Sequence, residues 1–257
     1  LTARARRSSP NKGPAYIRNK PSLLKRRLFF CKGRGCVDTF ELFGTIRLYV
    51  SGTHKVGTDA LLLSEFAAPR TGEWACDLGS GCGTVAARWF CGGQPAPARA
   101  YAVELQADAV RLMERSVAHG GLPAGRFIPV HADLRALQDV LPAGAFSLVT
   151  CNPPYKAAGR GLLSEAPGAR TARHETDCTL EDVCAAASRL LRFGGRLCIC
   201  QRPERLADAV CAMRAHGLEP KRLRMVQHSA AHAPWLFLLE ARRGGRPSMT
   251  IEPPKLF

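Results

Sequence analysis

A short apolar run that ends in a glycine-rich turn constrains the fold of this chain more than any other feature. Residues 73–78 read as a β-strand, Gly79-Ser80-Gly81-Cys82-Gly83 as a tight turn, and residues 84–90 as a helix. A strand, a glycine turn and a helix in this order open a nucleotide-type βα unit, whose turn lets the backbone approach a ligand closely. The pattern predicts an α/β domain that binds its ligand at the carboxyl edge of a parallel sheet.

Strands and helices continue to alternate after this turn. The pattern predicts strands at 99–104, 127–131, 146–151 and 196–200, and helices at 107–119, 180–191 and 204–216, with Thr179 as the N-cap of the second helix. Residues 223–226 and 235–239 are two more strands, and the short segment between them favours antiparallel pairing. We therefore expect a seven-stranded, mostly parallel sheet with helices on both faces and a C-terminal antiparallel hairpin.

An additional strand and helix are expected before the glycine turn. Residues 45–50 alternate like a short strand, and residues 60–66 read as a helix that Thr58 or Asp59 can cap. This segment could lie over the carboxyl edge of the main sheet. Thr58 and Asp59 are therefore candidate cofactor-binding residues.

Acidic residues mark the ends of three successive predicted strands. Asp77 ends the first, Glu104 ends the second, and Asp133 lies near the end of the third. Glu104 can accept hydrogen bonds from two ribose hydroxyls, and Asp133 can meet the amino group of an adenine beside Leu134. Asp77 would repel a pyrophosphate but suits a cofactor with a cationic amino-acid head. Each could singly be a solvated carboxylate, but together with Gly79, Gly81 and Gly83 they indicate a cofactor site.

The strand 146–151 stops abruptly at Asn152-Pro153-Pro154-Tyr155. The two prolines fix their own φ angles and lack N–H donors, so Asn152 should be held rigidly at the end of its strand. The Asn152 side-chain oxygen and the Pro153 carbonyl are two acceptors that can converge on one planar NH2 group. Tyr155 supplies a flat ring that can stack on the molecule that bears this NH2 group. A plain proline-terminated loop is the alternative, and the cofactor turn upstream weighs against it.

Composition fits one α/β domain with short appendages. The chain has 257 residues, of which 46% are hydrophobic, and no apolar run approaches the roughly 18 residues that a membrane span needs. The number of cysteines is odd, no C-x-x-C pair occurs, and several lie in apolar runs (Cys76, Cys151, Cys198, Cys200 and Cys211). Buried free thiols explain them better than disulfides or a metal site. We expect a cytoplasmic protein with no metal and no evident obligate protein partner.

The positive charge is concentrated at the beginning of the chain. The net charge is +16, and residues 1–34 hold eleven Lys and Arg and no acid, so the rest carries only +5. Such a segment suits phosphate backbones, although a solvated arm that binds nothing specific is the alternative. We expect residues 1–36 to be a basic arm that is disordered or weakly attached, and residues 37–257 to be the folded domain. Residues 156–177 form a loop of unusual length that could face a substrate.

Together, these motifs resemble the class I S-adenosylmethionine-dependent methyltransferases. The resemblance rests on residues 77–83, on Glu104 and Asp133, and on Asn152-Pro153-Pro154-Tyr155. Within that class, residues 55–63, residues 172–175 and the closing Pro-Ser-Met-Thr-Ile-Glu-Pro-Pro segment resemble the bacterial tRNA1(Val) adenine-37 N6-methyltransferases. This resemblance covers about residues 40–257 and does not include the basic residues 1–36, so it implies that residues 37–257 are a methyltransferase domain.

The resemblance implies an enzyme that binds S-adenosylmethionine and methylates adenine N6 in a tRNA anticodon loop. A methylated glutamine amide in a protein and an adenine in DNA are alternative substrates, because the same acceptors fit any planar NH2 group. A catalytically idle RNA-binding scaffold is the third alternative. We expect catalysis by positioning at residues 152–155, without a general base, and we expect His174 to be a substrate-binding or exposed residue rather than such a base.

Overall fold

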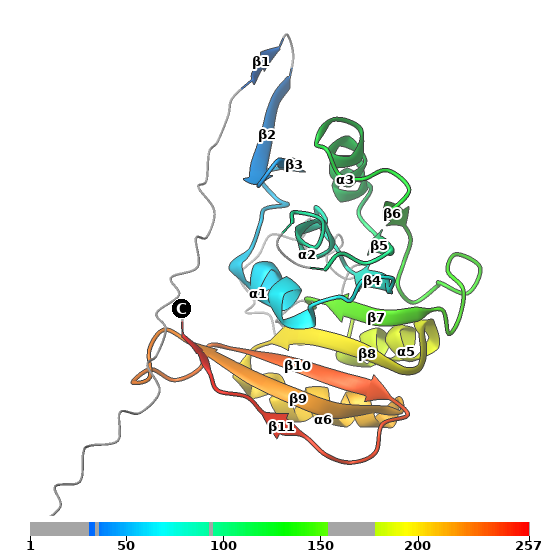
Figure 1. Cartoon of the computed structure of the whole chain (residues 1–257), viewed down its shortest axis with the longest axis vertical. Helices are drawn as coiled ribbons and strands as arrows, with labels where there is room; N and C mark the ends of the chain where they lie inside the picture. The colour runs from blue at the N-terminus through cyan, green and yellow to red at the C-terminus, as the bar shows by residue number, and fades with distance from the viewer. Residues whose placement is uncertain (1–30, 34–35, 93–94, 154–177, 257) are drawn as a thin grey trace, which may run out of the picture.

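The structure is a computed structural model that describes residues 31–33, 36–92, 95–153 and 178–256. Its main sheet contains five parallel strands in the spatial order β8-β7-β4-β5-β6 (Figure 1). Their bounds are Trp74–Leu78 for β4, Arg99–Glu104 for β5, Phe127–His131 for β6, Phe146–Cys151 for β7 and Leu191–Gln201 for β8. All five agree with predicted strands, and β8 begins five residues earlier than expected.

An antiparallel hairpin extends this sheet beyond β8, as predicted. Strand β10 (Leu236–Arg243) pairs antiparallel with both β8 and β9 (Leu218–Gln227). Two very short strands that the sequence pattern did not reveal, β11 (Thr250–Ile251) and β12 (Lys255–Leu256), lie parallel to β9. The seven-stranded sheet is therefore present, and the C-terminal residues widen it.

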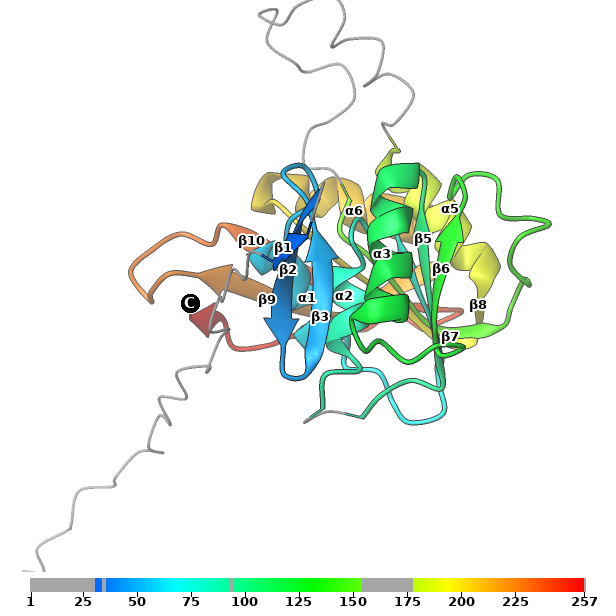
Figure 2. The ribbon, with the colours of Figure 1, turned by 90° about the horizontal axis from the view of Figure 1, so that it is seen from above.

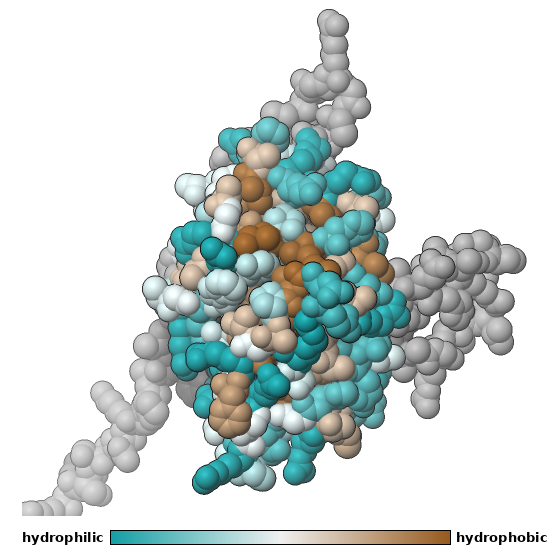
Figure 3. Space-filling model, turned by 90° about the vertical axis from the view of Figure 1, so that its right-hand side faces the viewer, coloured by the Kyte–Doolittle hydropathy of each residue, from teal (hydrophilic) through white to brown (hydrophobic). Residues whose placement is uncertain are grey.

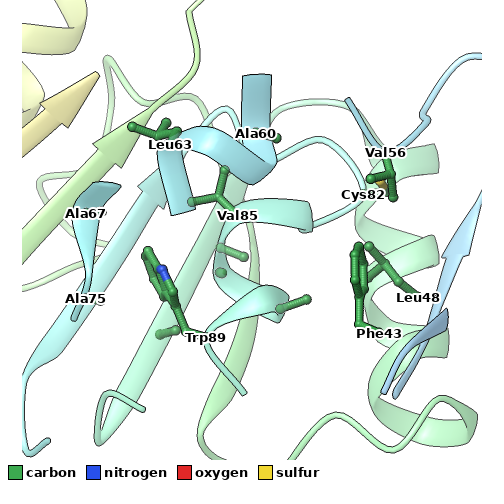
Figure 4. Close-up of a cluster of buried hydrophobic side chains, with 14 of the residues drawn as sticks. Phe43, Leu48, Val56, Ala60, Leu63, Ala67, Ala75, Cys82, Val85 and Trp89 are labelled. Atoms are coloured by element: carbon green, nitrogen blue, oxygen red, sulfur yellow. The ribbon is translucent and has the colours of Figure 1, made fainter. Parts of the chain in front are cut away.

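Helices cover both faces of the sheet. One face is covered by α1 (Thr58–Ala67), α2 (Thr84–Arg88) and α3 (Ala107–His119), and the other by α5 (Leu180–Leu190) and α6 (Leu206–Ala215), which follows the short turn η1 (Pro203–Arg205). In Figure 4, Leu63 of α1 lies near Val85 of α2, and Trp89 follows α2. The Trp89 indole N–H donates to the Ser64 carbonyl at 3.3 Å. Two apolar cores, one on each side of the sheet, thus fix the strand ends in place.

The beginning of α1 differs from its sequence-based prediction. Helix α1 begins at Thr58, and its N-cap is Gly57, whose backbone is extended and which has no side chain to donate or accept a hydrogen bond. Thr58 and Asp59 therefore lie in the first helical turn and do not cap the helix. By contrast, Thr179 caps α5 as predicted, since its hydroxyl accepts from the Asp182 N–H at 3.1 Å in a capping box.

A second, three-stranded sheet stands beside the main domain. It consists of β1 (Cys31–Gly33), β2 (Cys36–Phe43) and β3 (Ile46–Val50), which pair antiparallel. Strand β3 packs against α3, where the Ser116 hydroxyl accepts from the Tyr49 N–H at 2.9 Å (Figure 2). Only β3 was expected from the pattern, and β1 falls inside the stretch that we expected to be a basic arm. Residues 1–30 and the loop 156–177 lie outside the described residues.

Nine cysteines, from Cys76 to Cys211, are free, and six of them are buried, including Cys76, Cys151, Cys198 and Cys200 as the sequence predicted. Cys211 is the exception, because it is exposed on the side of α6 away from its buried residues Ala209, Ala212 and Met213. Among the residues that the structure describes, no helix has the length and apolar character needed to cross a membrane. The surface at the right of Figure 1 has its hydrophobic residues mainly in the upper half, among hydrophilic ones (Figure 3).

Candidate active site

The carboxyl ends of four parallel strands meet at one cavity. Strand register aligns Leu78 of β4 with both Val103 of β5 and Cys151 of β7, so the residues after these strands share one edge. A cavity of about 340 Å³ opens there. Its lining includes these predicted site residues: Gly79, Glu104, Asp133, Leu134, Asn152 and Pro153. The cavity thus brings together residues that are up to 74 positions apart in the sequence.

The glycine turn leaves open space on one side and packs tightly on the other. Gly79, Gly81 and Gly83 all have positive φ, at 66°, 56° and 85°. A Cβ at Gly79 or Gly81 would meet no atom within 4 Å, whereas a Cβ at Gly83 would lie 2.9 Å from the Phe127 ring and 3.0 Å from the Met113 sulfur. The first two glycines therefore leave room for a ligand, and Gly83 lets the turn pack against α3 and β6.

Glu104 ties the end of β5 to this turn. One of its carboxylate oxygens accepts from the Gly81 N–H and the other from the Gln106 N–H, both at 2.8 Å. The side chain is 6% exposed, so the turn and the carboxylate hold each other in one position. Glu104 still lines the 340 Å³ cavity, where its remaining acceptor capacity can serve ribose hydroxyls.

Asp77 is buried beneath the turn. It is 1% exposed and accepts hydrogen bonds from the Thr150 hydroxyl at 2.6 Å and the Ser80 hydroxyl at 2.8 Å. Burial raises the pKa of the Asp77 carboxyl to about 7, the two hydrogen bonds act in the opposite direction, and the nearby Glu104 adds to the rise. Asp77 also lines a second cavity and can therefore change charge at the edge of a ligand site.

The second cavity has a volume of about 190 Å³ and adjoins the first through Gly79 and Asn152, which line both. Most of its other lining residues come from the glycine turn and from the segment before α1, which contributes Thr53, His54, Lys55 and Gly57. This segment therefore lies at the carboxyl edge, as expected. Thr58 and Asp59 line neither cavity, although their neighbours Gly57 and Ala60 line the second.

Asn152 lies where the two cavities meet. Its side-chain oxygen accepts from the Cys200 thiol of β8 at 3.1 Å, and the Asp59 carbonyl lies 4.0 Å from the same sulfur. The side chain is half-buried, and Pro153 is buried beside it. Pro154 and Tyr155, the other two predicted catalytic residues, lie outside the described residues.

Asp133 is engaged by a neighbour. The Arg135 side chain donates to both of its carboxylate oxygens, the shortest contact being 2.6 Å. These hydrogen bonds lower the pKa of the Asp133 carboxyl below its usual value, so it stays ionised. An adenine amino group that binds Asp133 would share the carboxylate with Arg135.

Sequence reasoning missed several residues of this site. Thr150 and Ser80 hold Asp77, Cys200 contacts Asn152, and Arg135 covers Asp133. Hydroxyl residues inside the largely apolar strand 146–151 are a signal that could have pointed to Thr150, although Ser147 gives the same signal. Nothing in the sequence indicates Cys200, because its contact depends on the pairing of β7 with β8.

Comparison with known proteins identifies the family. Residues 49–214 match the family model of the methyltransferase small domain. The chain belongs to this family. It is therefore an S-adenosylmethionine-dependent methyltransferase by class, and the predictions of enzyme type and cofactor are confirmed at that level.

Relatives with a more specific name are about 30% identical to the chain over the aligned residues. One is the tRNA1(Val) (adenine(37)-N6)-methyltransferase of Aeromonas hydrophila, 30% identical over 164 residues, which cover 63% of this chain and 64% of that protein. Its namesake from Tolumonas auensis is 29% identical over 198 residues, which cover 77% of this chain and 79% of the relative. The chain thus spans just under two thirds of the Aeromonas protein.

Solved structures confirm the fold. A protein described as a predicted O-methyltransferase from Agrobacterium tumefaciens superposes with a TM-score of 0.58 at 22% identity, over 77% of this chain and 87% of that one. A precorrin-6y C5,15-methyltransferase from Geobacter metallireducens gives 0.52 at 14% identity, over 76% and 92%. At such identities the comparison concerns the α/β architecture alone.

The described residues fit S-adenosylmethionine. The open side of the turn at Gly79 and Gly81 leaves a cradle that a Cβ would begin to fill. Glu104 and Asp133 offer carboxylates in the larger cavity, and Leu134 offers an apolar contact for a flat ring. The smaller cavity adds Asp77, whose carboxylate suits a cationic amino-acid head.

Proposed function

We propose that the chain methylates the N6 amino group of an adenine in tRNA, and that this base is adenine 37 of the anticodon loop. The observation that supports this most is the position of Asn152, which lines both cavities at the end of β7. The names of the relatives supply the base and the RNA. The net charge of +16 favours a polyanionic substrate.

Residues of the larger cavity would hold the nucleoside part of the cofactor, and those of the smaller cavity its amino-acid part. Glu104 accepts hydrogen bonds from the ribose, and Asp133 with Leu134 binds the adenine. Asp77 and the Gly79 to Gly83 turn bind the amino-acid end. The bound cofactor supplies an electrophilic methyl group on a positively charged sulfur.

Asn152 and Pro153 would act on the target base. The Asn152 side-chain oxygen and the Pro153 carbonyl accept the two hydrogens of the exocyclic NH2 group, which turns the nitrogen lone pair toward the place where the cavities join. The Cys200 thiol, 3.1 Å from the same Asn152 oxygen, keeps the carboxamide from rotating. Tyr155 stacks on the face of the base after it has left its own stack.

No general base is needed for this role. The amino nitrogen becomes positively charged during transfer and loses its proton to water afterwards. The chain therefore contributes orientation and two fixed acceptors, which interact more strongly with the charged nitrogen of the transition state than with the neutral amine.

The proposal predicts a large effect of Asn152→Ala. Because one transition-state hydrogen bond is lost, we expect turnover to fall by about two or more powers of ten while cofactor affinity is unchanged. Methyl transfer to total tRNA is measured with methyl-labelled cofactor, followed by mass spectrometry of nucleosides for N6-methyladenosine, and cofactor affinity by calorimetry. Gln138→Ala, which removes an exposed amide outside both cavities, is the control.

The same assay separates the substrates. Label in N6-methyladenosine of tRNA supports the proposal, whereas label in DNA or in a protein glutamine would replace it. Normal turnover by the Asn152→Ala variant would remove Asn152 from the mechanism. Cofactor binding without transfer to any of the three would favour an RNA-binding scaffold.

A further inference from the structure

A cluster of flat side chains lies on the loop that joins β9 and β10. The ring of His228 stacks on the indole of Trp235, with ring centres 5.8 Å apart and planes inclined by 18°. His232 meets His228 edge-on at 6.2 Å. His228 and His232 are exposed, and Trp235 is half-buried against the apolar core.

Arg202, which follows β8, completes this group, and we refer to Arg202, His228, His232 and Trp235 as the Trp235 cluster. The Arg202 guanidinium carbon lies 5.9 Å from the centre of the Trp235 ring, and its N–H donates to the Trp235 carbonyl at 3.0 Å. Ser229 holds His232 through a hydrogen bond of 2.7 Å. The rings are therefore fixed in position, although two of them face solvent.

The Trp235 cluster lies on the same sheet edge as Asn152. Register aligns Cys151 of β7 with Ile199 of β8, so Asn152 and Arg202 both follow strands that end at the carboxyl edge. Phe237 of β10 aligns with Gln201, which brings Trp235 to this edge as well. Asn152 is level with Cys200, which pairs with Leu238, which in turn pairs with Arg224. With about 4.8 Å between strands and about 3.3 Å per residue along them, Trp235 lies roughly 15 Å and His228 roughly 20 Å from Asn152. Figure 1 shows the β9–β10 loop projecting at the left end of the hairpin.

We propose that the Trp235 cluster stacks an unpaired RNA base that lies in the same loop as the adenine to be methylated, a few nucleotides from it. This inference rests on the proposed function. Single-stranded RNA is recognised by stacking on aromatic rings and guanidinium planes, and enzymes that extrude a base also contact its flanking nucleotides. The Trp235 cluster has both kinds of group, namely aromatic ring faces and a guanidinium. A protein partner would instead require an apolar patch, which these polar rings and this cation do not form.

The exposed His228 ring is the surface that an incoming base would contact. Stacking depends on a flat face rather than on a particular hydrogen bond, so an aromatic replacement should keep the function and a methyl group should lose it. His228→Tyr and His228→Ala are therefore a matched pair. His119→Ala is the control, because His119 is also exposed but ends α3, at the amino edge of the sheet.

Binding is measured by fluorescence anisotropy with a labelled RNA hairpin whose loop contains the unpaired adenine, and with a blunt duplex of the same stem. For the hairpin we expect about tenfold weaker binding by His228→Ala at fixed salt, with His228→Tyr and His119→Ala close to the unchanged protein. The duplex should bind all four proteins equally. Equal loss for hairpin and duplex would indicate a charge contact and overturn the stacking role.

Photocrosslinking gives a second measurement that does not depend on catalysis. Hairpins carrying one 5-bromouridine at successive loop positions within a few nucleotides of the adenine should include one that crosslinks to the tryptic peptide 225–242, which contains His228, His232 and Trp235. If tRNA is methylated but this peptide is not crosslinked and the His228→Ala variant binds the hairpin normally, the inference is overturned and the proposed function stands. If the peptide is crosslinked but no RNA is methylated, the proposed function is overturned and the stacking role stands.

Discussion

At the scale of single residues, Asp77 is the most unusual side chain of the site. Its carboxyl is 1% exposed, and burial raises its pKa to about 7 despite two hydrogen bonds from hydroxyl groups. A folded-state pKa above the ordinary value of about 3.8 means that the folded protein holds this proton more tightly than the unfolded chain does. The contribution of Asp77 to stability is therefore greatest at low pH and is lost as the pH rises through about 7.

The fall in stability with rising pH gives a prediction for Asp77→Asn. Between about pH 4 and pH 7, Asp77 should lower the free energy of unfolding by up to about 1.4 kcal/mol per pH unit, and the variant should lack this slope. Urea unfolding at several pH values measures it. Thr150→Val, which removes one of the hydrogen bonds that lower the pKa, should extend the slope to higher pH. Parallel pH profiles for the unchanged protein and Asp77→Asn would contradict the assignment.

At the scale of elements, local signals located the strands and helices well. Strands β5, β6 and β7 and helix α3 have the bounds that alternation and periodicity predicted. The start of α1 was missed because Gly57 takes the capping position in place of Asp59, whose side chain is the stronger capping group. Strands β1, β2, β11 and β12 were missed because their pairing partners, rather than their own patterns, define them.

The same reasoning holds for the site. The residues after the strand ends could be predicted because parallel register brings them to one edge. The contacts between them could not, since Thr150 with Asp77 and Cys200 with Asn152 each join different strands. Sequence patterns thus predicted that the site lies at the carboxyl edge of the sheet and identified most of its residues. Which of these residues contact one another depends on side-chain packing between strands.

The glycine turn gives a prediction at this scale, because Gly83 and Gly72 share a φ of 85° but differ in surroundings. A Cβ at Gly72 meets nothing within 4 Å, whereas one at Gly83 meets Phe127 and Met113 at 2.9 and 3.0 Å. Gly72→Ala should cost about 1 to 2 kcal/mol for its backbone conformation. Gly83→Ala should cost about 1 to 3 kcal/mol more, since it also overpacks the core. Urea unfolding of both variants measures the difference, and equal losses would contradict the clash.

At the scale of the whole molecule, a buried ionic network joins the C-terminal hairpin to the rest of the domain. Arg196 of β8 donates to Glu240 of β10 at 3.4 Å, to Glu73 before β4 at 3.2 Å and to the Ala67 carbonyl of α1 at 3.0 Å. Arg222 of β9 donates to the same Glu240 oxygen at 2.8 Å. The network thus connects three strands, one helix and the entrance to the strand that carries Asp77.

Removing Arg196 should therefore destabilise the whole domain. Arg196→Met removes the cation that pairs with Glu73 and leaves Glu240 with Arg222. Both carboxylates are less than 10% exposed, so the free energy of unfolding should fall by about 3 to 5 kcal/mol. Arg205→Met is the control, because Arg205 pairs at 2.7 Å with the largely exposed Asp208 and should cost less than about 1 kcal/mol. Adding Glu73→Gln to Arg196→Met should recover part of the loss, because Glu73 is then a buried charge that has lost its cation, whereas Glu240 keeps Arg222. If urea unfolding gave similar losses for the two arginine variants, the hairpin would be held by its backbone pairing and apolar core alone.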